Sequence, residues 1–326
     1  MNIYEPLVTI IIPVYNGSDF LREAIESALA QTYKNIEILV INDGSNDNNA
    51  SEAIALSYGN QITYYSKPNG GVSSALNFAL NKMNGEWFSW LSHDDLYFPN
   101  KIEKQIEFLN KLKIKNPEID LNKLVLHSAT ISINKDGKTI KTPNYKDIKI
   151  QESLEDIVIG NVYNYRLSGC SFLIPVSAYK DLGGFREDIR TVSDVEFWYR
   201  LAFNGYNFYC LKDDILVKNR SHGKQVGKVR VTLFDKEVEE LHKNIADQLF
   251  DYLFTKNKTY EMKRFYFGLV KRDLLKTADY TKKKYLKNTI STVQYNIVLP
   301  IKKIGWTIIG RTRNIARYFY RIINVK

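Results

Sequence analysis

Two adjacent carboxylates, Asp94 and Asp95, directly follow the apolar, aromatic-rich run Trp87 to Leu91. Negative charge at the end of a buried strand raises the free energy of the fold unless a cation or a hydrogen-bond donor compensates it. Mg²⁺ and Mn²⁺ prefer hard oxygen ligands, and Mg²⁺ commonly completes its shell with water and substrate phosphates. The pair therefore indicates a metal site for a nucleoside diphosphate. Capping of the helix that begins near Pro99 is an equal alternative, because acids are ordinary at helix starts.

The segments around this pair alternate between strand and helix patterns. Val8 to Ile12 is a continuous β-branched run, as expected of a strand buried on both faces. Further strands are predicted at 36–41, 62–65 and 87–91, and helices at 18–30, 47–58, 72–83 and 99–113. This order predicts an α/β fold with a mostly parallel sheet flanked by helices and joined by right-handed crossovers.

Three of the predicted strands end in polar clusters. These are Tyr15-Asn16, Asn42-Asp43 and His93-Asp94-Asp95. Ligands of parallel α/β sheets bind beyond the carboxyl ends of the strands. The coincidence of the three clusters therefore predicts a ligand site at that edge.

Five motifs follow one another along the chain: Pro13-Val-Tyr-Asn16, Asn42-Asp-Gly-Ser45, Asn69-Gly-Gly-Val72, Ser92-His-Asp-Asp95 and Ser193-Asp-Val-Glu-Phe-Trp-Tyr-Arg200. Through these motifs the chain resembles, over roughly residues 6 to 227, a family 2 nucleotide-sugar glycosyltransferase with a GT-A (Rossmann-like) fold, of the bacterial cell-surface polysaccharide type. The resemblance implies transfer of a sugar from a nucleoside-diphosphate sugar, with UDP-sugars favoured.

The resemblance implies roles for the residues at the strand ends. Tyr15 would stack on the base and Asp43 would accept a hydrogen bond from a ring N–H of the base. The full set of implied donor-binding residues is Pro13, Tyr15, Asn16, Asp43, Asn69, Gly70, Gly71, Ser73, His93 and Asp94. A rim aromatic for Tyr15 and a turn-forming acid for Asp43 are the alternatives.

The resemblance also implies a cofactor, Mn²⁺ or Mg²⁺, bound by Asp94 between the two phosphates of the donor. Asp95 and His222 are further expected metal ligands, and Arg220 and Lys224 are expected phosphate contacts. An unengaged surface histidine explains His222 equally well. Ser92 stands where the family usually has the first acid of this motif.

The expected catalytic base is Asp194, on a helix predicted from Ser193 to Phe203. A carboxylate beside the anomeric carbon can remove the proton of an attacking hydroxyl, which inverts the anomeric centre. Capping of the helix is the alternative for Ser193 and Asp194. Since the Gln-x-x-Arg-Trp signature of processive relatives is absent, we expect one sugar to be added per encounter.

Two downstream segments are expected to line the sugar and acceptor pocket. Residues 168–175 are predicted to form a strand, and residues 182–187 a turn. The expected pocket residues are Gly169, Cys170, Gly184, Phe185, Glu196 and Trp198. A purely structural turn with Phe185 filling the core is an equal alternative.

Charge divides the chain into two expected domains, a catalytic domain over 1–228 and a helical, basic region over 229–326. Residues 251–326 contain 18 Lys and Arg against 4 Asp and Glu, whereas the whole chain has a net charge of +10. Helices are predicted at 233–254 and 256–275. The segment 280–326 interleaves basic residues with Trp306 and aliphatic side chains, which favours an anionic membrane surface. Packing on the catalytic domain or on a second subunit of a homo-oligomer stays open, while the absence of a recognisable nucleic-acid fold argues against nucleic acid.

Two cysteines without metal-ligand spacing favour a reducing compartment. No signal-peptide pattern and no apolar run of about 18 residues is present, so we expect a cytoplasmic protein that contacts the inner face of the bacterial cytoplasmic membrane. The expected acceptor is a hydroxyl of a glycan or of a lipid-linked glycan, as in lipopolysaccharide or capsule synthesis.

Two other functional classes compete with the transferase. A nicotinamide-dependent oxidoreductase is disfavoured because the first turn lacks G-x-G-x-x-G. A catalytically inactive nucleotide-sugar-binding module stays open, since Ser92 and Ser193 replace acids while Asp94 and Asp194 are retained.

Overall fold

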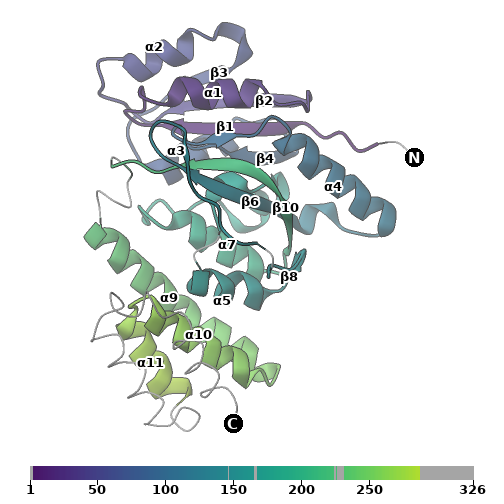
Figure 1. The fold of residues 1–326 in the computed structure, drawn as a ribbon, viewed down its shortest axis with the longest axis vertical. Coiled ribbons are helices and arrows are strands. Elements are labelled where there is room, and N and C mark those ends of the chain that lie inside the picture. Colours follow the sequence, from purple (N-terminus) through teal and green to yellow (C-terminus); the bar gives the residue numbers. More distant parts are fainter. Residues whose placement is uncertain (1–2, 146, 165–166, 224, 226–230, 287–326) are drawn as a thin grey trace. The chain divides into compact units, whose positions relative to one another are not determined.

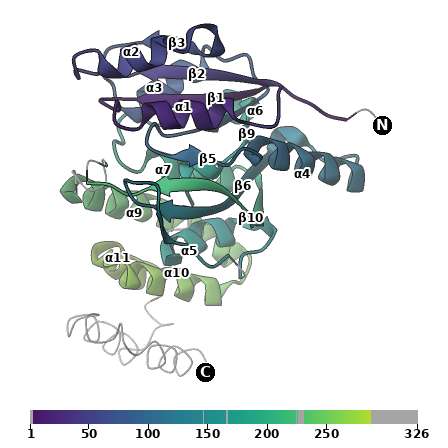
Figure 2. The ribbon, with the colours of Figure 1, turned by 45° about the horizontal axis from the view of Figure 1, so that its top comes forward.

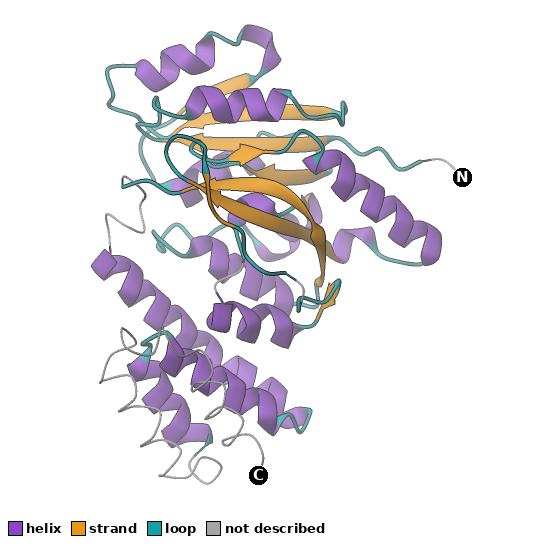
Figure 3. Ribbon diagram, in the orientation of Figure 1, coloured by secondary structure: helices purple, strands orange, loops and turns teal. Residues whose placement is uncertain are grey.

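The computed structural model describes residues 3–145, 147–164, 167–223, 225 and 231–286. The chain divides into two compact units, one within residues 1–161 and 166–237 and the other within 162–165 and 238–326. The first unit holds two β-sheets flanked by helices (Figure 3), which confirms the predicted α/β class. The division falls after the domain boundary that we expected at residue 228.

The first sheet carries the strand ends that the sequence singled out (Figure 1). Its strand order is β3-β2-β1-β4-β9, with the first four strands parallel and β9 antiparallel to β4. Every residue of β1 is buried, because its continuous apolar run packs on both faces of the sheet. The bounds are β1 (Val8–Val14), β2 (Ile36–Asn42), β3 (Thr63–Ser66), β4 (Trp87–Trp90) and β9 (Ile174–Pro175).

Three helices connect these parallel strands, namely α1 (Leu21–Leu29), α2 (Ala50–Leu56) and α3 (Val72–Leu80). Helices α1 and α2 contact one another, while α3 packs against β1 and β2. Helix α1 buries its apolar stripe, formed by Leu21, Ala24, Ile25 and Ala28, in the core. The expected right-handed crossovers place α1 and α2 on one face of the sheet and α3 on the other.

The second sheet was not predicted. Its long strands β6 (Leu124–Ile133) and β10 (Asn207–Arg220) are parallel and lie side by side (Figure 2). The short strands are β5 (Leu96–Tyr97), β7 (Thr139–Lys141) and β8 (Gln151–Glu152). Strand β5 pairs with the end of β10 and brings Arg220 beside the Asp94-Asp95 segment.

The strand predicted over 168–175 requires a correction. Residues Gly169–Ser171 form a 3₁₀ turn, and only Ile174–Pro175 pair as β9. Small polar residues such as Ser171 favour turns over strands, because their side chains bond nearby backbone groups. Here the Ser171 hydroxyl donates to the Ser168 carbonyl.

Seven further helices lie within the described residues. Helix α7 has the bounds predicted for it, and α9 covers the helix predicted at 233–254. The helix predicted over 256–275 corresponds to α10, which is shorter at both ends. After α10 the chain turns at Asp273, which has a φ of 67°, and continues as α11. The helices are α4 (Lys101–Lys115), α5 (Leu154–Asn164), α6 (Val176–Leu182), α7 (Ser193–Phe203), α9 (Val231–Thr255), α10 (Thr259–Lys271) and α11 (Leu275–Tyr285).

Within the described residues, no helix combines the length and the apolar character that crossing a bilayer requires. Most of the basic segment 280–326, including Trp306, lies outside the described residues.

Candidate active site

The carboxyl ends of β1, β2 and β4 lie at one edge of the first sheet. Val14 pairs with Asn42, and Ile11 pairs with Trp90, so the segments that follow these strands share that edge. Asn16 links two of them, since its N–H donates to the Ser45 hydroxyl over 3.0 Å. Tyr15 keeps 45% of its surface exposed there, which leaves its aromatic face available for stacking on a base.

Asp43 is buried at this edge, and its carboxylate accepts hydrogen bonds from the segment Lys67 to Gly71. The Lys67 ammonium lies 2.8 Å from Oδ1, and the backbone N–H groups of Gly70 and Gly71 donate over 3.0 and 2.7 Å. The Asn69 amide also donates to Asp43. Asp43 therefore fixes the conformation of residues 69–71, which we call the donor loop.

Gly71 shows why this loop needs glycine. Its φ of 89° lies in the left-handed region, and a Cβ atom there would lie 2.5 Å from Nη1 of Arg190. The Arg190 guanidinium donates to the carbonyl of the neighbouring Gly70. A side chain at position 71 would therefore displace this contact.

Asp94 and His222 form a pair beyond the end of β4. Nε2 of His222 lies 2.8 Å from Oδ2 of Asp94, and the two side chains are only 12% and 13% exposed. Burial lowers the pKa of the adjacent His93 below its ordinary value, so its ring is neutral at pH 7. A carboxylate oxygen and an imidazole nitrogen at this spacing are a chemically suitable ligand pair for Mn²⁺, and the carboxylate also suits Mg²⁺.

Asp95 faces a different environment from its neighbour. Its carboxyl oxygens accept from the Arg220 N–H over 2.7 Å and from the Cys170 thiol over 3.1 Å. Burial, reinforced by the charge of Asp94, raises the pKa of Asp95 well above its ordinary value. These contacts give Asp95 a role in joining the strand end to β10 and to the 3₁₀ turn.

Arg220, an expected phosphate contact, is buried and bonded to protein oxygens. Its guanidinium donates to the carbonyls of Asp94 and Lys135 and to the carboxylate of Glu23, over 2.7 to 2.9 Å. Arg220 therefore holds the backbone of Asp94 in place. Lys224, the other expected phosphate contact, lies outside the described residues.

Asp194 lies in the first turn of α7. Its Oδ1 accepts from the Val195 N–H over 2.8 Å. Burial raises the pKa of Asp194 to about 6, although backbone N–H groups partly oppose that shift. The preceding Ser193 is joined to the start of α3 by a 2.7 Å hydrogen bond from the Ser73 hydroxyl. The carboxyl thus combines tight positioning with a pKa close to neutrality, as a general base requires.

Comparisons with known proteins identify the family of this chain. The family model for glycosyl transferase family 2 matches residues 9–116. An uncharacterized glycosyltransferase of Rickettsia prowazekii is 41% identical over 248 residues, which cover 76% of this chain and 74% of that protein. The chain belongs to glycosyltransferase family 2.

Other members of the family are longer, and solved structures share the fold. An uncharacterized glycosyltransferase of Rickettsia bellii is 37% identical over 320 residues, covering 94% of this chain but only 44% of the relative. The chain thus spans less than half of that relative. Staphylococcus aureus TarS, residues 1–349 in complex with UDP-GlcNAc, superposes with a TM-score of 0.59 at 16% identity, over 88% of this chain and 77% of TarS 1–349. That likeness supports the GT-A fold.

The expected pocket residues of this family 2 chain are mostly buried. Glu196 forms an ion pair with Arg200, which also donates to the carbonyls of Leu182 and Gly184 over 2.6 and 2.7 Å. Trp198 is fully buried and stacks on Phe172 at a ring distance of 4.1 Å. The Arg200 contacts fasten α7 to the turn before it, and the Trp198 ring packs α7 against Phe172.

The remaining pocket residues pack closely against neighbouring elements. A Cβ atom at Gly184 would lie 2.1 Å from the Asn77 side-chain oxygen, and one at Gly169 would lie 2.6 Å from the Trp90 ring. Phe185 and Cys170 are buried beside them. The turn at residues 182–187 therefore packs against α3, and the 3₁₀ turn packs against the end of β4.

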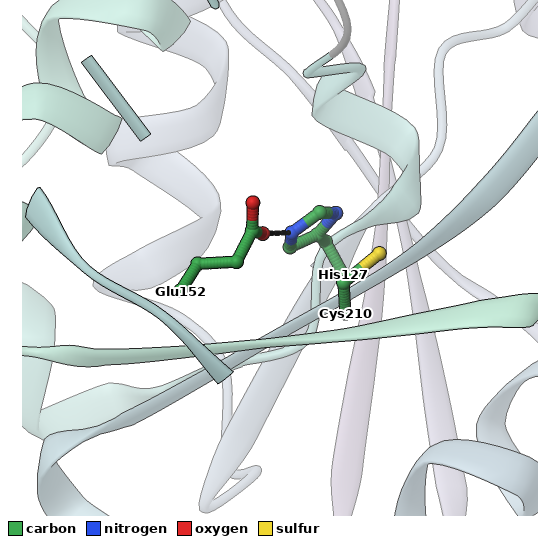
Figure 4. A group of neighbouring side chains, drawn as sticks. All are labelled: His127, Glu152 and Cys210. Atoms are coloured by element: carbon green, nitrogen blue, oxygen red, sulfur yellow. Dashed lines mark hydrogen bonds and ion pairs between the residues drawn. The ribbon is translucent and has the colours of Figure 1, made fainter. Parts of the chain in front are cut away.

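A second polar group escaped the sequence analysis. His127, Glu152 and Cys210 are buried, come from β6, β8 and β10, and offer atoms within 4.8 Å of one another that could hold a metal ion (Figure 4). Burial alone would lower the pKa of His127, but the Cys210 thiol and the Glu152 carboxylate outweigh it and raise the pKa to about 9. Nε2 of His127 is hydrogen-bonded to Glu152.

This group is separate from the strand-end site. His127 pairs in register with Cys210, while Arg220 pairs with Ile133, which lies six residues further along β6. At about 3.3 Å per residue the separation along the strand is about 20 Å. A buried imidazolium and a buried carboxylate compensate one another's charge, so the contacts within this group favour a structural ion pair.

Lys67, Arg190 and Glu237 were also missed as functional residues. Lys67 lies two residues before the motif Asn69-Gly-Gly-Val72, and its pairing with Asp43 depends on the approach of β2 to the donor loop. Arg190 and Glu237 carry no motif signal, because their contacts are made by chain segments far apart in sequence.

Proposed function

We propose that this family 2 glycosyltransferase moves one sugar from a nucleoside-diphosphate sugar to a hydroxyl of a glycan or of a lipid-linked acceptor. The observation that carries the proposal is Asp194, a half-buried residue at the start of α7 whose carboxyl pKa is raised to about 6. It is tied through Ser193 to the helix that follows the donor loop. The hydrogen bond between Ser193 and Ser73 supports a proton acceptor close to the loop expected to bind the donor.

The proposed reaction is a single displacement. The acceptor hydroxyl oxygen attacks the anomeric carbon and forms the new glycosidic bond while its proton passes to the Asp194 carboxylate. The bond from the anomeric carbon to the diphosphate breaks, and the nucleoside diphosphate leaves with the electron pair. Attack from the face opposite the leaving group inverts the anomeric centre.

Asp94 and His222 would hold the divalent cation, and Tyr15 with the donor loop would hold the nucleoside. The close oxygen and nitrogen pair fits Mn²⁺, and the carboxylate fits Mg²⁺. When bound, the ion supplies positive charge that stabilises the departing diphosphate. Arg220, which is bonded both to Asp95 and to the Asp94 carbonyl, would keep Asp94 in position. The complex of the fold neighbour TarS with UDP-GlcNAc supports a UDP-sugar as donor.

The acceptor and the cellular location rest on the C-terminal region. The excess of basic residues in 251–326 supports contact with an anionic surface, as for an enzyme working on a lipid-linked glycan of the bacterial envelope at the cytoplasmic face. A homo-oligomer contact through the same region is the competing proposal. Binding to vesicles with anionic lipid but not to vesicles without it would support the membrane contact. A dimer or larger oligomer in solution, without such binding, would support the homo-oligomer contact.

Release of nucleoside diphosphate from a panel of nucleotide sugars tests the activity itself. We expect turnover with at least one UDP-sugar, loss of turnover after chelation of divalent metal, and recovery on addition of Mn²⁺ or Mg²⁺. Binding without turnover across the panel, with donor and acceptor sugars both varied, would instead identify a nucleotide-sugar-binding module. Membership of family 2 argues against the oxidoreductase alternative.

A further inference from the structure

The segment that leads into α7 is held by one carboxylate from α9. Glu237 accepts from the N–H of Arg190 over 2.9 Å, and from the N–H and the hydroxyl of Thr191 over 2.7 and 2.6 Å. Hydrogen bonds to an ionised acceptor are stronger than neutral ones. Residues 190 and 191 are therefore fixed by a side chain about 46 positions away in sequence, immediately before Ser193 and Asp194.

The same segment reaches the donor loop. The Arg190 guanidinium donates to the Gly70 carbonyl, and it occupies the space that the missing side chain of Gly71 leaves open. Asp43 holds the opposite side of this loop through the N–H groups of Gly70 and Gly71. The loop is thus fixed between Asp43 and Arg190.

We propose that Glu237 is a positioning residue for sugar transfer. It sets the backbone at Arg190 and Thr191 and so fixes two things at once: the start of α7, where Asp194 must face the anomeric carbon, and the guanidinium that supports the donor loop. The inference rests on the proposed function of Asp194 and extends it to a residue outside the family 2 motifs.

The two halves of this arrangement predict different kinetic effects. Glu237→Ala releases the backbone before Asp194, so kcat falls by about tenfold or more, since small displacements of a reacting group are costly. Arg190→Met leaves the hydrogen bonds of its backbone N–H in place and removes only the donor-loop contact, so the KM for the donor rises while kcat changes little. Glu237→Gln keeps one acceptor oxygen and gives an intermediate kcat.

Glu240→Ala is the matched control, because Glu240 is an exposed glutamate of the same helix. Thermal unfolding of all four variants shows whether they are folded. The proposal requires Glu237→Ala to lose kcat per folded molecule while Glu240→Ala matches the wild type. Equal kcat and KM in Glu237→Ala and Glu240→Ala would overturn it.

Hydrogen exchange gives a readout that needs no turnover. In Glu237→Ala we expect faster amide exchange both in residues 188–194 and in the donor loop, with no change in Glu240→Ala. Unchanged amide exchange in the donor loop would overturn the proposed link from Glu237 through Arg190 to that loop. If the wild type and Asp194→Asn release nucleoside diphosphate at the same rate, the proposed function fails; if only Glu237→Ala equals the wild type, this inference alone fails.

Discussion

The strand-end region around Asp94 and the helix-start region around Asp194 use the same side chain in contrasting surroundings. Asp94 lies against an imidazole, and its backbone is held by a buried guanidinium. Asp194 accepts from backbone N–H groups of its own helix, and burial raises its pKa to about 6. The difference shows how environment separates a carboxylate suited to holding a cation from one suited to accepting a proton.

Asp194→Asn breaks this comparison most severely. The amide keeps the shape and the hydrogen bond from Val195 but cannot take a proton, so kcat for transfer should fall by about 10²- to 10⁴-fold. Calorimetric titration should show that Asp194→Asn binds UDP and metal with the same affinity as the wild type. Transfer at the wild-type rate would remove Asp194 from the mechanism.

Glu152→Gln sharpens the comparison with a buried carboxylate that has no proposed part in transfer. Loss of the pair with His127 should lower the free energy of unfolding by about 3 kcal/mol while kcat is unchanged. Because Cys210 and Glu152 together raise the folded pKa of His127 to about 9, their joint contribution to stability is complete below pH 6.5 and is lost as pH rises through about 9. Urea unfolding at pH 6 and pH 10 measures this, and a difference between variant and wild type that is the same at both values would contradict the ion pair.

Asp94→Asn and Asp95→Asn compare two neighbours. The first removes the charge paired with His222, and we expect metal-dependent nucleotide affinity to fall by about tenfold or more. The second replaces a carboxyl whose oxygens already accept from the Arg220 N–H and the Cys170 thiol and whose pKa burial raises, so affinity should change much less. Titration of both variants with Mn²⁺ and UDP decides the matter, and equal losses would show that both carboxyls bind the metal.

Much of the first sheet could be predicted from local patterns. The β-branched run of β1 and the helix pattern that follows it are signals within one segment each, and β1 and α1 lie within or close to the ranges expected for them. The second sheet could not be predicted, because β6 and β10 come from segments about 80 residues apart and pair only in the folded chain.

The same limit applies to the site. Sequence motifs identify Asp43 and Asp94, whereas the burial of Asp95 and Arg220 follows from the approach of β10 to the strand end. The expected roles of Asp95 as a metal ligand and of Arg220 as a phosphate contact stay predictions, and nothing in the motif shows that both groups are also bonded within the protein.

The pH dependence of kcat at saturating donor and metal tests the central claim most directly. If Asp194 is the base, kcat should rise with pH and level off above an apparent pKa near 6, falling about tenfold per pH unit below it. The Asp194→Asn enzyme should show a low rate without that step. A wild-type profile that is flat between pH 5 and pH 7, or a step retained in Asp194→Asn, would contradict the account.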